Sequence, residues 1–275
     1  DIRIIGEPKT IDNDLVHTDH TPGFGSAARY VASTVREITL DASVYEKKSV
    51  TIVEIMGRHA GWLTAASCLA RANGAKGPDF IYLCEVPFSI DTFLKDVKAK
   101  LEEQDAVIIA VSEGVKNKDG RYISEEVQSS AVDSFGHSYI AGAAKVLEDA
   151  VRNEIGCKVR SIELNLMQRC AAHLASATDI QESRMLGKAA CQYALEGAGG
   201  MMAAVIRTSD KPYATEFKAL PVCDIANAIK SVPADYINDA GNDVTEKMVD
   251  YLTPLIQGEM NTVYENGIPK YIYLY

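Results

Sequence analysis

Two β-branched runs constrain the fold of this chain more than any other feature of its sequence. Residues 105–111 read Asp-Ala-Val-Ile-Ile-Ala-Val, and residues 49–55 read Ser-Val-Thr-Ile-Val-Glu-Ile. Runs that are apolar at nearly every position, rather than at every second one, are typical of strands buried on both faces of a parallel sheet. The sequence therefore predicts a sheet with helices on both of its faces.

Helical and extended segments alternate along most of the chain. Apolar residues recur at helical spacing between the strand-like runs, and this order predicts an α/β fold of parallel β-α-β units. Further strands are expected over residues 1–5, 79–84, 159–166 and 200–206, and helices over about residues 23–45, 61–71, 90–102, 139–153, 181–195 and 245–257, whereas residues 117–132 are polar and less regular.

The composition is that of a globular protein with an acidic surface. The chain has 275 residues, 47% of them hydrophobic, which is enough for one large or two moderate domains. Its formal net charge of -10 argues against nonspecific binding to nucleic acid or to an anionic membrane, and no apolar run is long enough to span a bilayer. Its six cysteines form no Cys-x-x-Cys pair, so they are expected to be reduced, mostly buried thiols of a cytoplasmic protein.

Polar groups follow three of the expected strands. Residues 8–14, Pro-Lys-Thr-Ile-Asp-Asn-Asp, follow the first strand, Gly57 and Arg58 follow the second, and Glu113 follows residues 105–111. Ligands bind beyond the carboxyl ends of parallel strands, so these groups mark the expected site. Gly57 would let backbone N–H groups approach an anion, and Arg58 offers charged donors suited to a phosphoryl group. A self-bonded turn, a solvent-facing arginine and a solvated loop acid are the ordinary alternatives.

Two motifs of the chain resemble the 6-phosphofructokinase family. Residues 10–14 match its T-I-D-N-D segment, and residues 56–62, Met-Gly-Arg-His-Ala-Gly-Trp, match its M-G-R-x-x-G segment in the same order. The resemblance implies that Asp12 takes the proton from the 1-hydroxyl of fructose 6-phosphate and that Arg58 stabilises charge on the transferring phosphoryl group. It places these further residues at the substrate: Thr10, Ile11, Met56, Gly57 and Glu113.

The 6-phosphate of the sugar is expected to meet two arginines. By resemblance these are Arg160 and Arg169, and in the family one of them often reaches across a subunit interface. The sequence departs from the family pattern at this point, because Leu166 stands where ATP-dependent bacterial members commonly have a histidine and Cys170 where R-G-G is usual. The interface arginine expected before residues 50–55 is also absent, and Lys48 is the candidate that would supply its charge.

Lys9 bears on the identity of the phosphoryl donor. Pyrophosphate-dependent members typically read P-K-T-I-D-N-D, as this chain does, whereas many ATP-dependent bacterial members have glycine in place of Lys9. An ammonium group there would neutralise the departing phosphate and obstruct the α-phosphate of a nucleotide. Some ATP-dependent relatives carry the lysine too, so ATP stays open as the donor.

The expected metal is Mg²⁺, bridging the phosphates of the donor. The family carries a G-G-D loop before T-I-D-N-D, and this sequence has none, so the chain is expected to be a fragment without its N-terminal part. The main metal ligand is expected in that part. Asp14 is expected to act on the metal only indirectly, through its water shell, or to orient Asp12.

These expectations combine into one hypothesis. The chain is interpreted as part of a pyrophosphate-dependent 6-phosphofructokinase, a reversible glycolytic enzyme that forms a homodimer or homotetramer. Residues 1–22 and about 167–240 are assigned to a donor-binding domain, and about 23–166 with the C-terminal segment to a fructose 6-phosphate-binding domain. The alternatives are an ATP-dependent enzyme and, from a different class, a noncatalytic sugar-phosphate-binding regulatory subunit.

Overall fold

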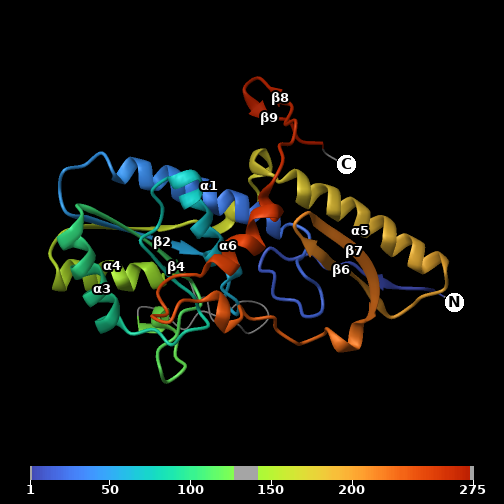
Figure 1. Ribbon diagram of the computed structural model, residues 1–275, viewed down its shortest axis with the longest axis horizontal. Coiled ribbons are helices and arrows are strands. Elements are labelled where there is room, and N and C mark those ends of the chain that lie inside the picture. Colours follow the sequence, from blue (N-terminus) through green and yellow to red (C-terminus); the bar gives the residue numbers. More distant parts are fainter. Residues whose placement is uncertain (1, 127–141, 273–275) are drawn as a thin grey trace. The chain divides into compact units, whose positions relative to one another are not determined.

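The chain divides into two compact units in a computed structural model, which describes residues 2–126 and 142–272 (Figure 1). Unit 1 comprises Asp1–Tyr30, Leu166–Ala228 and Asp250–Tyr275, and unit 2 comprises Val31–Asn165 and Ile229–Val249. The chain thus leaves and re-enters each unit, so each unit contains residues that are far apart in the sequence.

Unit 2 is built on a four-stranded parallel sheet. Its strands are β2 (Ser49–Ile55), β3 (Phe80–Tyr82), β4 (Ala106–Ser112) and β5 (Lys158–Glu163), in the spatial order β3-β4-β2-β5. All residues of β2 and β4 except the first of each are buried, which confirms the prediction from their β-branched runs. Ile55 pairs with Ser112, so the carboxyl ends of the two central strands lie side by side.

Helices cover both faces of this sheet, as predicted. Helices α3 (Ile90–Glu103) and α4 (Ala143–Glu154) lie on one side, and the part of α1 (Phe24–Ala42) that belongs to unit 2 lies on the other (Figure 1). Residues at helical spacing on α3 join the core of the sheet, and burial of each such side chain contributes about 1.5–3 kcal/mol. They are Phe93, Leu94, Val97 and Leu101.

Unit 1 contains a three-stranded sheet of mixed direction. Strand β1 (Ile5–Gly6) is parallel to β6 (Met201–Asp210), which is antiparallel to β7 (Tyr213–Pro221). Helix α5 (Ala177–Leu195) packs on it through Leu186, which shares a core cluster with residues of β6. The smaller elements of the chain are α2 (Trp62–Ala66) in unit 2, α6 (Glu246–Leu252), within which the chain passes from unit 2 to unit 1, and the hairpin of β8 (Tyr264–Glu265) and β9 (Ile268–Pro269) in unit 1.

The strand predictions in and next to unit 1 need correction. The strand expected over residues 1–5 is only β1, and Ile2 is 92% exposed. Strand β6 continues to Asp210 because it pairs with β7, which the sequence did not predict. The strand expected over residues 159–166 ends at Glu163, and a 3-10 turn over Asn165–Arg169 follows it.

The helix predictions hold, with shifted ends. Helix α5 begins at Ala177 rather than 181 because the hydroxyl oxygen of Ser176 accepts the N–H of Asp179 and caps the helix there. The helices expected over residues 61–71 and 245–257 are each a short α-helix continued by a 3-10 turn. Residues 127–141, which include the start of one expected helix and part of the polar region 117–132, lie outside the described residues.

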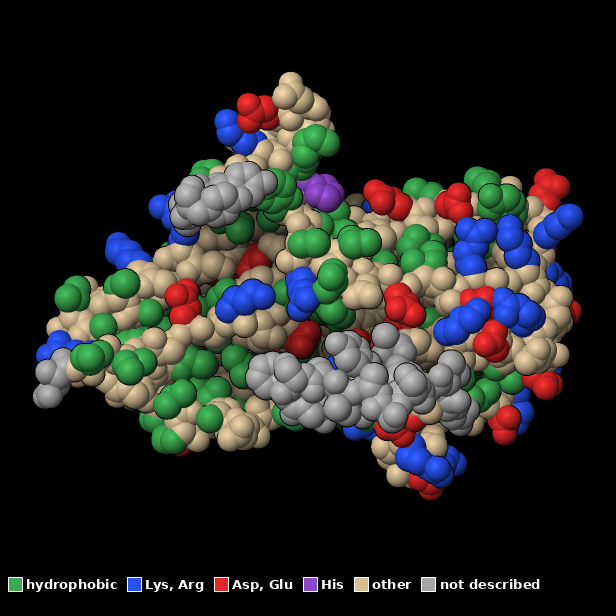
Figure 2. Space-filling view, turned by 180° about the vertical axis from the view of Figure 1, so that it is seen from behind, with side chains coloured by type: hydrophobic (Ala, Val, Ile, Leu, Met, Phe, Trp, Pro, Cys, Tyr) green, Lys and Arg blue, Asp and Glu red, His purple; other side chains and the backbone are tan. Residues whose placement is uncertain are grey.

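The surface is mixed in charge. Figure 2 shows acidic and basic side chains interspersed over one face rather than gathered by sign. No helix among residues 2–126 and 142–272 is long and apolar enough to cross a membrane. All six cysteines are free, but the expectation that most are buried is wrong, since Cys170, Cys191 and Cys223 are exposed and only Cys68 is buried.

Candidate functional site

The turn of residues 8–14 follows β1 in unit 1. Pro8 and Ile11 are buried, Lys9 is exposed, and Thr10, Asp12 and Asp14 are half-buried. The hydroxyl oxygen of Thr10 accepts the N–H of Asp12 at 3.1 Å, and the carbonyl of Thr10 accepts the hydroxyl of Thr21 at 2.7 Å. The turn therefore contains the self-bonding expected of a polar loop and still leaves the Asp12 carboxylate half-exposed.

Asn13 fixes the middle of this turn. Its φ of 57° is in the left-handed region, which asparagine tolerates better than most residues, and its side chain is fully buried. The side-chain amide donates to the hydroxyl oxygen of Tyr251 at 2.9 Å. The sequence analysis did not identify Tyr251, because no local pattern links it to a turn 238 residues earlier.

The turn after β2 in unit 2 depends on glycine. Gly57 has a φ of 129°, and a Cβ there would run into the carbonyl oxygen of Ala60. The N–H of Gly57 donates to Oε1 of Glu113 at 3.2 Å, and its carbonyl accepts the hydroxyl of Ser112 at 2.8 Å. Gly57 and Glu113 are thus in direct contact at the carboxyl ends of β2 and β4.

Arg58 lies against the same strand end. A Cβ on Gly114 would collide with the backbone of Arg58, so the two segments approach as closely as a glycine allows. Of the polar groups predicted at one edge of a single sheet, Gly57, Arg58 and Glu113 do lie together, but Asp12 follows β1, which belongs to a different sheet. Met56 and Arg58 are half-buried, and Asp12 belongs to the other unit.

Glu54 is a buried acid that the sequence analysis passed over. It lies within β2 with 5% exposure, and its two carboxylate oxygens accept the N–H groups of Gly142 at 3.2 Å and Ala144 at 2.7 Å. Burial raises the pKa of Glu54 to about 7, against the lowering effect of those N–H groups, and the charges of Glu163 and Glu113 raise it further. A glutamate inside an otherwise apolar strand was the signal that could have revealed it.

Two cations line one cavity of unit 1. Lys9 and Arg169 border a cavity of about 260 Å³, together with Ile11, Gln168 and Cys170. Arg169 is exposed at the end of the 3-10 turn that follows β5. Asp179 closes the side of this cavity and accepts the N–H of Gly23 at 2.9 Å. The cavity combines two cations with small side chains and one carboxylate, that of Asp179.

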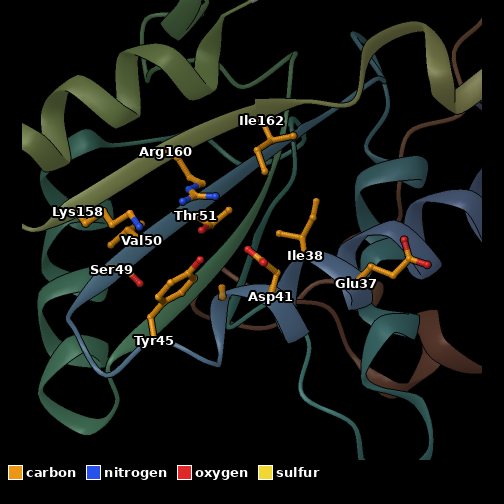
Figure 3. A pocket seen from close by; sticks show the side chains of 11 residues that line it. Glu37, Ile38, Asp41, Tyr45, Ser49, Val50, Thr51, Lys158, Arg160 and Ile162 are labelled. Atoms are coloured by element: carbon orange, nitrogen blue, oxygen red, sulfur yellow. The ribbon is translucent and has the colours of Figure 1, made fainter.

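Arg160 lines a different cavity, in unit 2. Figure 3 shows its side chain beside Thr51, with Lys158 of the same strand near Tyr45. The cavity measures about 240 Å³, and the ammonium of Lys158 lies 4.6 Å from the centre of the Tyr45 ring. Asp41 of α1 lines it too, so its charge is mixed. Arg160 and Arg169, which the resemblance assigns to one phosphate, are therefore in separate cavities of separate units.

Lys48, the candidate for an interface cation, pairs within the chain. Its ammonium lies 2.8 Å from Oε1 of Glu102, and both side chains are exposed. Such a pair is weak in water and can exchange partners.

A cluster of charged side chains in unit 1 was also missed. His20 is buried with 3% exposure and lies between the carboxylates of Asp19 and Glu182. The guanidinium of Arg207 is 3.2 Å from Asp19. His20 and Asp19 are only a few residues beyond the turn with Asp12, whereas Glu182 and Arg207 come from α5 and β6.

Comparison with known proteins finds one family over most of the chain. Residues 1–194 match the family described as Phosphofructokinase. The chain is 41% identical over 276 residues to the pyrophosphate–fructose 6-phosphate 1-phosphotransferase of Xanthomonas campestris pv. campestris, covering 99% of this chain and 66% of the relative. It is 39% identical over 265 residues to the protein of the same name from Halomonas elongata, covering 96% and 62%.

A solved structure extends the likeness to the fold. The pyrophosphate-dependent phosphofructokinase of Nitrosospira multiformis superposes with a TM-score of 0.87 at 33% identity, covering 98% of this chain and 64% of that one. The chain spans about two thirds of the length of these relatives.

Proposed function

Because the chain belongs to the phosphofructokinase family, we propose that the full-length protein transfers a phosphoryl group from pyrophosphate to the 1-hydroxyl of fructose 6-phosphate. The products are fructose 1,6-bisphosphate and phosphate. One observation carries the proposal, which is that Lys9 and Arg169 line one cavity directly beside the turn of Asp12. Two cations next to a half-buried carboxylate suit a phosphorylated substrate and an anionic donor.

Asp12 is the general base of the proposed reaction. Its carboxylate accepts the proton of the 1-hydroxyl, the freed oxygen forms a bond to phosphorus, and the bond from that phosphorus to the bridging oxygen of pyrophosphate breaks. The leaving group departs as phosphate. The Thr10 hydroxyl oxygen, which accepts the N–H of Asp12, keeps the base in place while the proton moves.

Charge on the phosphoryl groups is neutralised by two side chains. Lys9 acts on the departing phosphate, and Arg58 acts on the transferring group. The close approach of Gly114 to the Arg58 backbone supports this role, because it holds in place the backbone from which the Arg58 side chain extends. Since the leaving phosphate and the new ester are of similar energy, the reaction runs in both directions.

The sugar is held by residues that end β2 and β4 and by the turn of Asp12. In unit 2, Glu113 accepts a sugar hydroxyl and Met56 and Gly57 contact the sugar, and in unit 1 Thr10 and Ile11 are assigned to the sugar as well. Arg169 and Arg160 line separate cavities, so they are assigned to the 6-phosphate with one of them reaching it from a neighbouring subunit. Lys48 serves a neighbouring subunit, which requires a homodimer or homotetramer.

Mg²⁺ is the proposed cofactor of the full-length protein. Among the described residues, no group of three or more His, Cys, Asp and Glu side chains is placed to hold a metal ion. The residues present therefore do not fit a complete metal site, and no step above passes through the ion. Asp14 is half-buried beside the base and is assigned the indirect role of orienting it.

In this proposal both units contribute residues to the reaction. Unit 1 contributes Lys9, Asp12 and Arg169 and forms part of the donor-binding domain. Unit 2 contributes Arg58 and Glu113 and forms the fructose 6-phosphate-binding domain. The proposed site of action is the cytoplasm, where the sugar phosphates of glycolysis occur.

The proposal is tested by the initial rate of fructose 1,6-bisphosphate formation by the full-length protein, with pyrophosphate or ATP as donor. We expect pyrophosphate to be strongly preferred. The Lys9→Ala variant should lose on the order of 10²–10³ in kcat with pyrophosphate, as expected when one charge-stabilising donor is removed. Lys188→Ala removes an exposed lysine from α5 and is the matched control, expected to match the wild type.

Two outcomes would overturn parts of the proposal. A preference for ATP that Lys9→Ala leaves unchanged would refute the donor assignment while the sugar assignment survives. Binding of fructose 6-phosphate without turnover on either donor would refute catalysis and favour a noncatalytic sugar-phosphate-binding protein.

A further inference from the structure

A set of four charged side chains, with His20 and Glu182 buried and Asp19 and Arg207 half-buried, lies close to the turn that carries Asp12. Nδ1 of His20 is 2.7 Å from Oδ2 of Asp19, and Nε2 is 2.6 Å from Oε2 of Glu182. Nε of Arg207 donates to the same oxygen of Asp19 at 3.2 Å. Two carboxylates, one imidazole ring and one guanidinium therefore share a small volume of unit 1.

The geometry favours a charged His20. An ionised carboxylate only accepts hydrogen bonds, so a ring with a carboxylate at each nitrogen must donate from both and is an imidazolium. The second oxygen of Glu182 accepts the hydroxyls of Tyr213 at 2.8 Å and Thr215 at 2.9 Å, which favours its ionised form. With His20 charged, two negative and two positive groups balance, which is the condition under which buried charges are tolerated.

The shift in the pKa of His20 also favours the charged ring. Burial by itself lowers it, but the hydrogen bonds and the charges of Asp19 and Glu182 outweigh burial and raise the pKa above its ordinary value. The same contacts lower the pKa of Glu182, although burial opposes this. The cluster is therefore intact when His20 is charged and loses its balance when the ring is deprotonated.

This cluster is joined to the catalytic turn by hydrogen bonds. The hydroxyl of Tyr251 donates to the carbonyl of Asp19 at 2.7 Å and accepts the side-chain amide of Asn13, the neighbour of Asp12. Arg207 donates to the carbonyl of Tyr251 at 3.0 Å, and its guanidinium lies 4.5 Å from the centre of that ring. Asn13 is in the left-handed region, so its conformation depends on such outside contacts.

A second connection ties the loop to the sheet. The N–H of Asp19 donates to the carbonyl of Val205 on β6 at 2.8 Å. The N–H of Val205 donates to the hydroxyl oxygen of Thr18 at 3.0 Å, and that hydroxyl lies 3.0 Å from the carbonyl of His20. The position of residues 18–20 on the sheet and the position of Asn13 are thus set together.

Resting on the function proposed above, we propose that His20 is a positioning residue of the catalytic turn. As an imidazolium between Asp19 and Glu182, it holds Asp19 so that Tyr251 fixes Asn13 and thereby the carboxylate of Asp12. Deprotonation of His20 removes its hydrogen bond to one of the two carboxylates, leaves the cluster with an excess negative charge, and displaces the turn. The expected consequence is a kcat that falls on the alkaline side because of His20, with little change in KM.

The charged and titratable groups around His20 are all accounted for in this prediction. They are Asp19 on its own loop, Glu182 on α5, Arg207 on β6, Tyr213 on β7 and Tyr251 on α6. Burial next to Glu182 raises the pKa of Tyr213, and the pKa of Arg207 is raised as well, so both keep their protons while His20 titrates. His20 is therefore the group of this cluster that we expect to lose its proton first as the pH rises above its ordinary pKa.

The test is the pH profile of kcat and KM for the full-length protein with pyrophosphate and fructose 6-phosphate, for the wild type and Glu182→Gln. The variant keeps the acceptor for Tyr213 and Thr215 but removes one of the two charges that stabilise the imidazolium. We expect the alkaline limb of kcat, along which the rate drops about tenfold per pH unit, to move to lower pH. His173→Gln changes an exposed histidine of unit 1 and should leave the profile unchanged.

A second measurement does not depend on a variant that folds. NMR titration of the five histidine rings in the wild-type protein, with His20 assigned by its absence in His20→Gln or by its nuclear contacts, gives its protonation directly. His20 neutral at the pH of maximal kcat would overturn the inference, as would an alkaline limb that Glu182→Gln does not move. Absence of turnover with any donor would instead refute the proposed function, and the inference with it.

Discussion

The turn of residues 9–14 and the turn of residues 56–61 both follow a strand, but different contacts hold them. The first is fixed by side chains from distant parts of unit 1, above all the Asn13 amide on the Tyr251 hydroxyl. The second is fixed by backbone geometry, with Gly57 at a positive φ and the backbone of Arg58 pressed against Gly114. The first turn depends on side chains that are distant in the sequence, whereas the second depends mainly on glycines and on backbone contacts with the end of β4.

This difference sets what each turn can do. A turn held by ionisable side chains responds to pH, because its hydrogen bonds depend on the charge of groups such as His20. A turn held mainly by close backbone contacts is more rigid and depends less on pH, although the N–H of Gly57 donates to the ionisable Glu113. For the proposed reaction this is a sensible division, since the base lies on the adjustable turn and the charge-stabilising Arg58 on the rigid one.

The largest expected effect concerns the base on the adjustable turn. Asp12→Asn keeps the backbone hydrogen bond to Thr10 and the shape of the side chain but removes the proton acceptor. We expect kcat of the full-length protein to fall on the order of 10²–10⁴, with an unchanged urea midpoint. Asp91→Asn, an exposed change on α3, is the control. Near wild-type turnover by Asp12→Asn would remove Asp12 from the mechanism.

The rigid turn is tested by adding one methyl group. In Gly114→Ala the new Cβ meets the backbone of Arg58, which cannot rotate away as a side chain would. We expect a loss of about 1–3 kcal/mol in the free energy of unfolding and a higher KM for fructose 6-phosphate. Gly199→Ala is the matched control, because its Cβ would meet nothing within 4 Å. Equal effects of the two substitutions would show that the contact is not tight.

Glu54 is a titratable group in unit 2, on the strand that leads into the rigid turn. Its pKa is raised to about 7 by burial, so it contributes stability in the protonated form that is lost as the pH rises from its ordinary value of 4.5 through about 7. The shift corresponds to at most about 3 kcal/mol. In Glu54→Gln the urea midpoint should therefore fall less between pH 5 and pH 7.5 than in the wild type.

His20 also contributes stability that decreases as the pH rises above its ordinary pKa. This contribution is present in both the wild type and Glu54→Gln, so the difference between their slopes of urea midpoint against pH reports Glu54 alone. Glu154→Gln, an exposed change at the end of α4, should keep the wild-type slope. Parallel slopes for the wild type and Glu54→Gln would show that this carboxyl is already ionised at pH 5.

Features set by local residues could be predicted from the sequence, and features set by distant side chains could not. Strands β2 and β4 leave an unmistakable pattern because both of their faces are buried, and their parallel register then brings Gly57 and Glu113 into contact. Local residues carry all of that information. The edge of the sheet, and three of the residues on it, could therefore be predicted without knowing the rest of the fold.

The missed features have no such local pattern. Strand β7 alternates in exposure, but its inward positions include Thr215, whose hydroxyl serves Glu182, so the expected apolar alternation is broken. His20 resembles any loop histidine until α5 places Glu182 against it, 162 residues further along the chain. Ile2 and Ile4 led to an overprediction, because their apolar character indicated a buried strand where both side chains are exposed. Sequence patterns could not predict contacts between single polar side chains that are far apart in the sequence.

The smallest expected effect concerns Lys48, which tests whether unit 2 serves a neighbouring subunit. Its pair with Glu102 is exposed, so losing the pair itself should leave the urea midpoint essentially unchanged. Lys48→Ala and Glu102→Ala both remove the pair, but only the first removes the cation. If the cation reaches the sugar phosphate of a neighbour, Lys48→Ala should raise the KM for fructose 6-phosphate a few-fold, and Glu102→Ala should not raise it. Equal KM values for the two variants would confine Lys48 to its pair with Glu102 and leave the interface role unsupported.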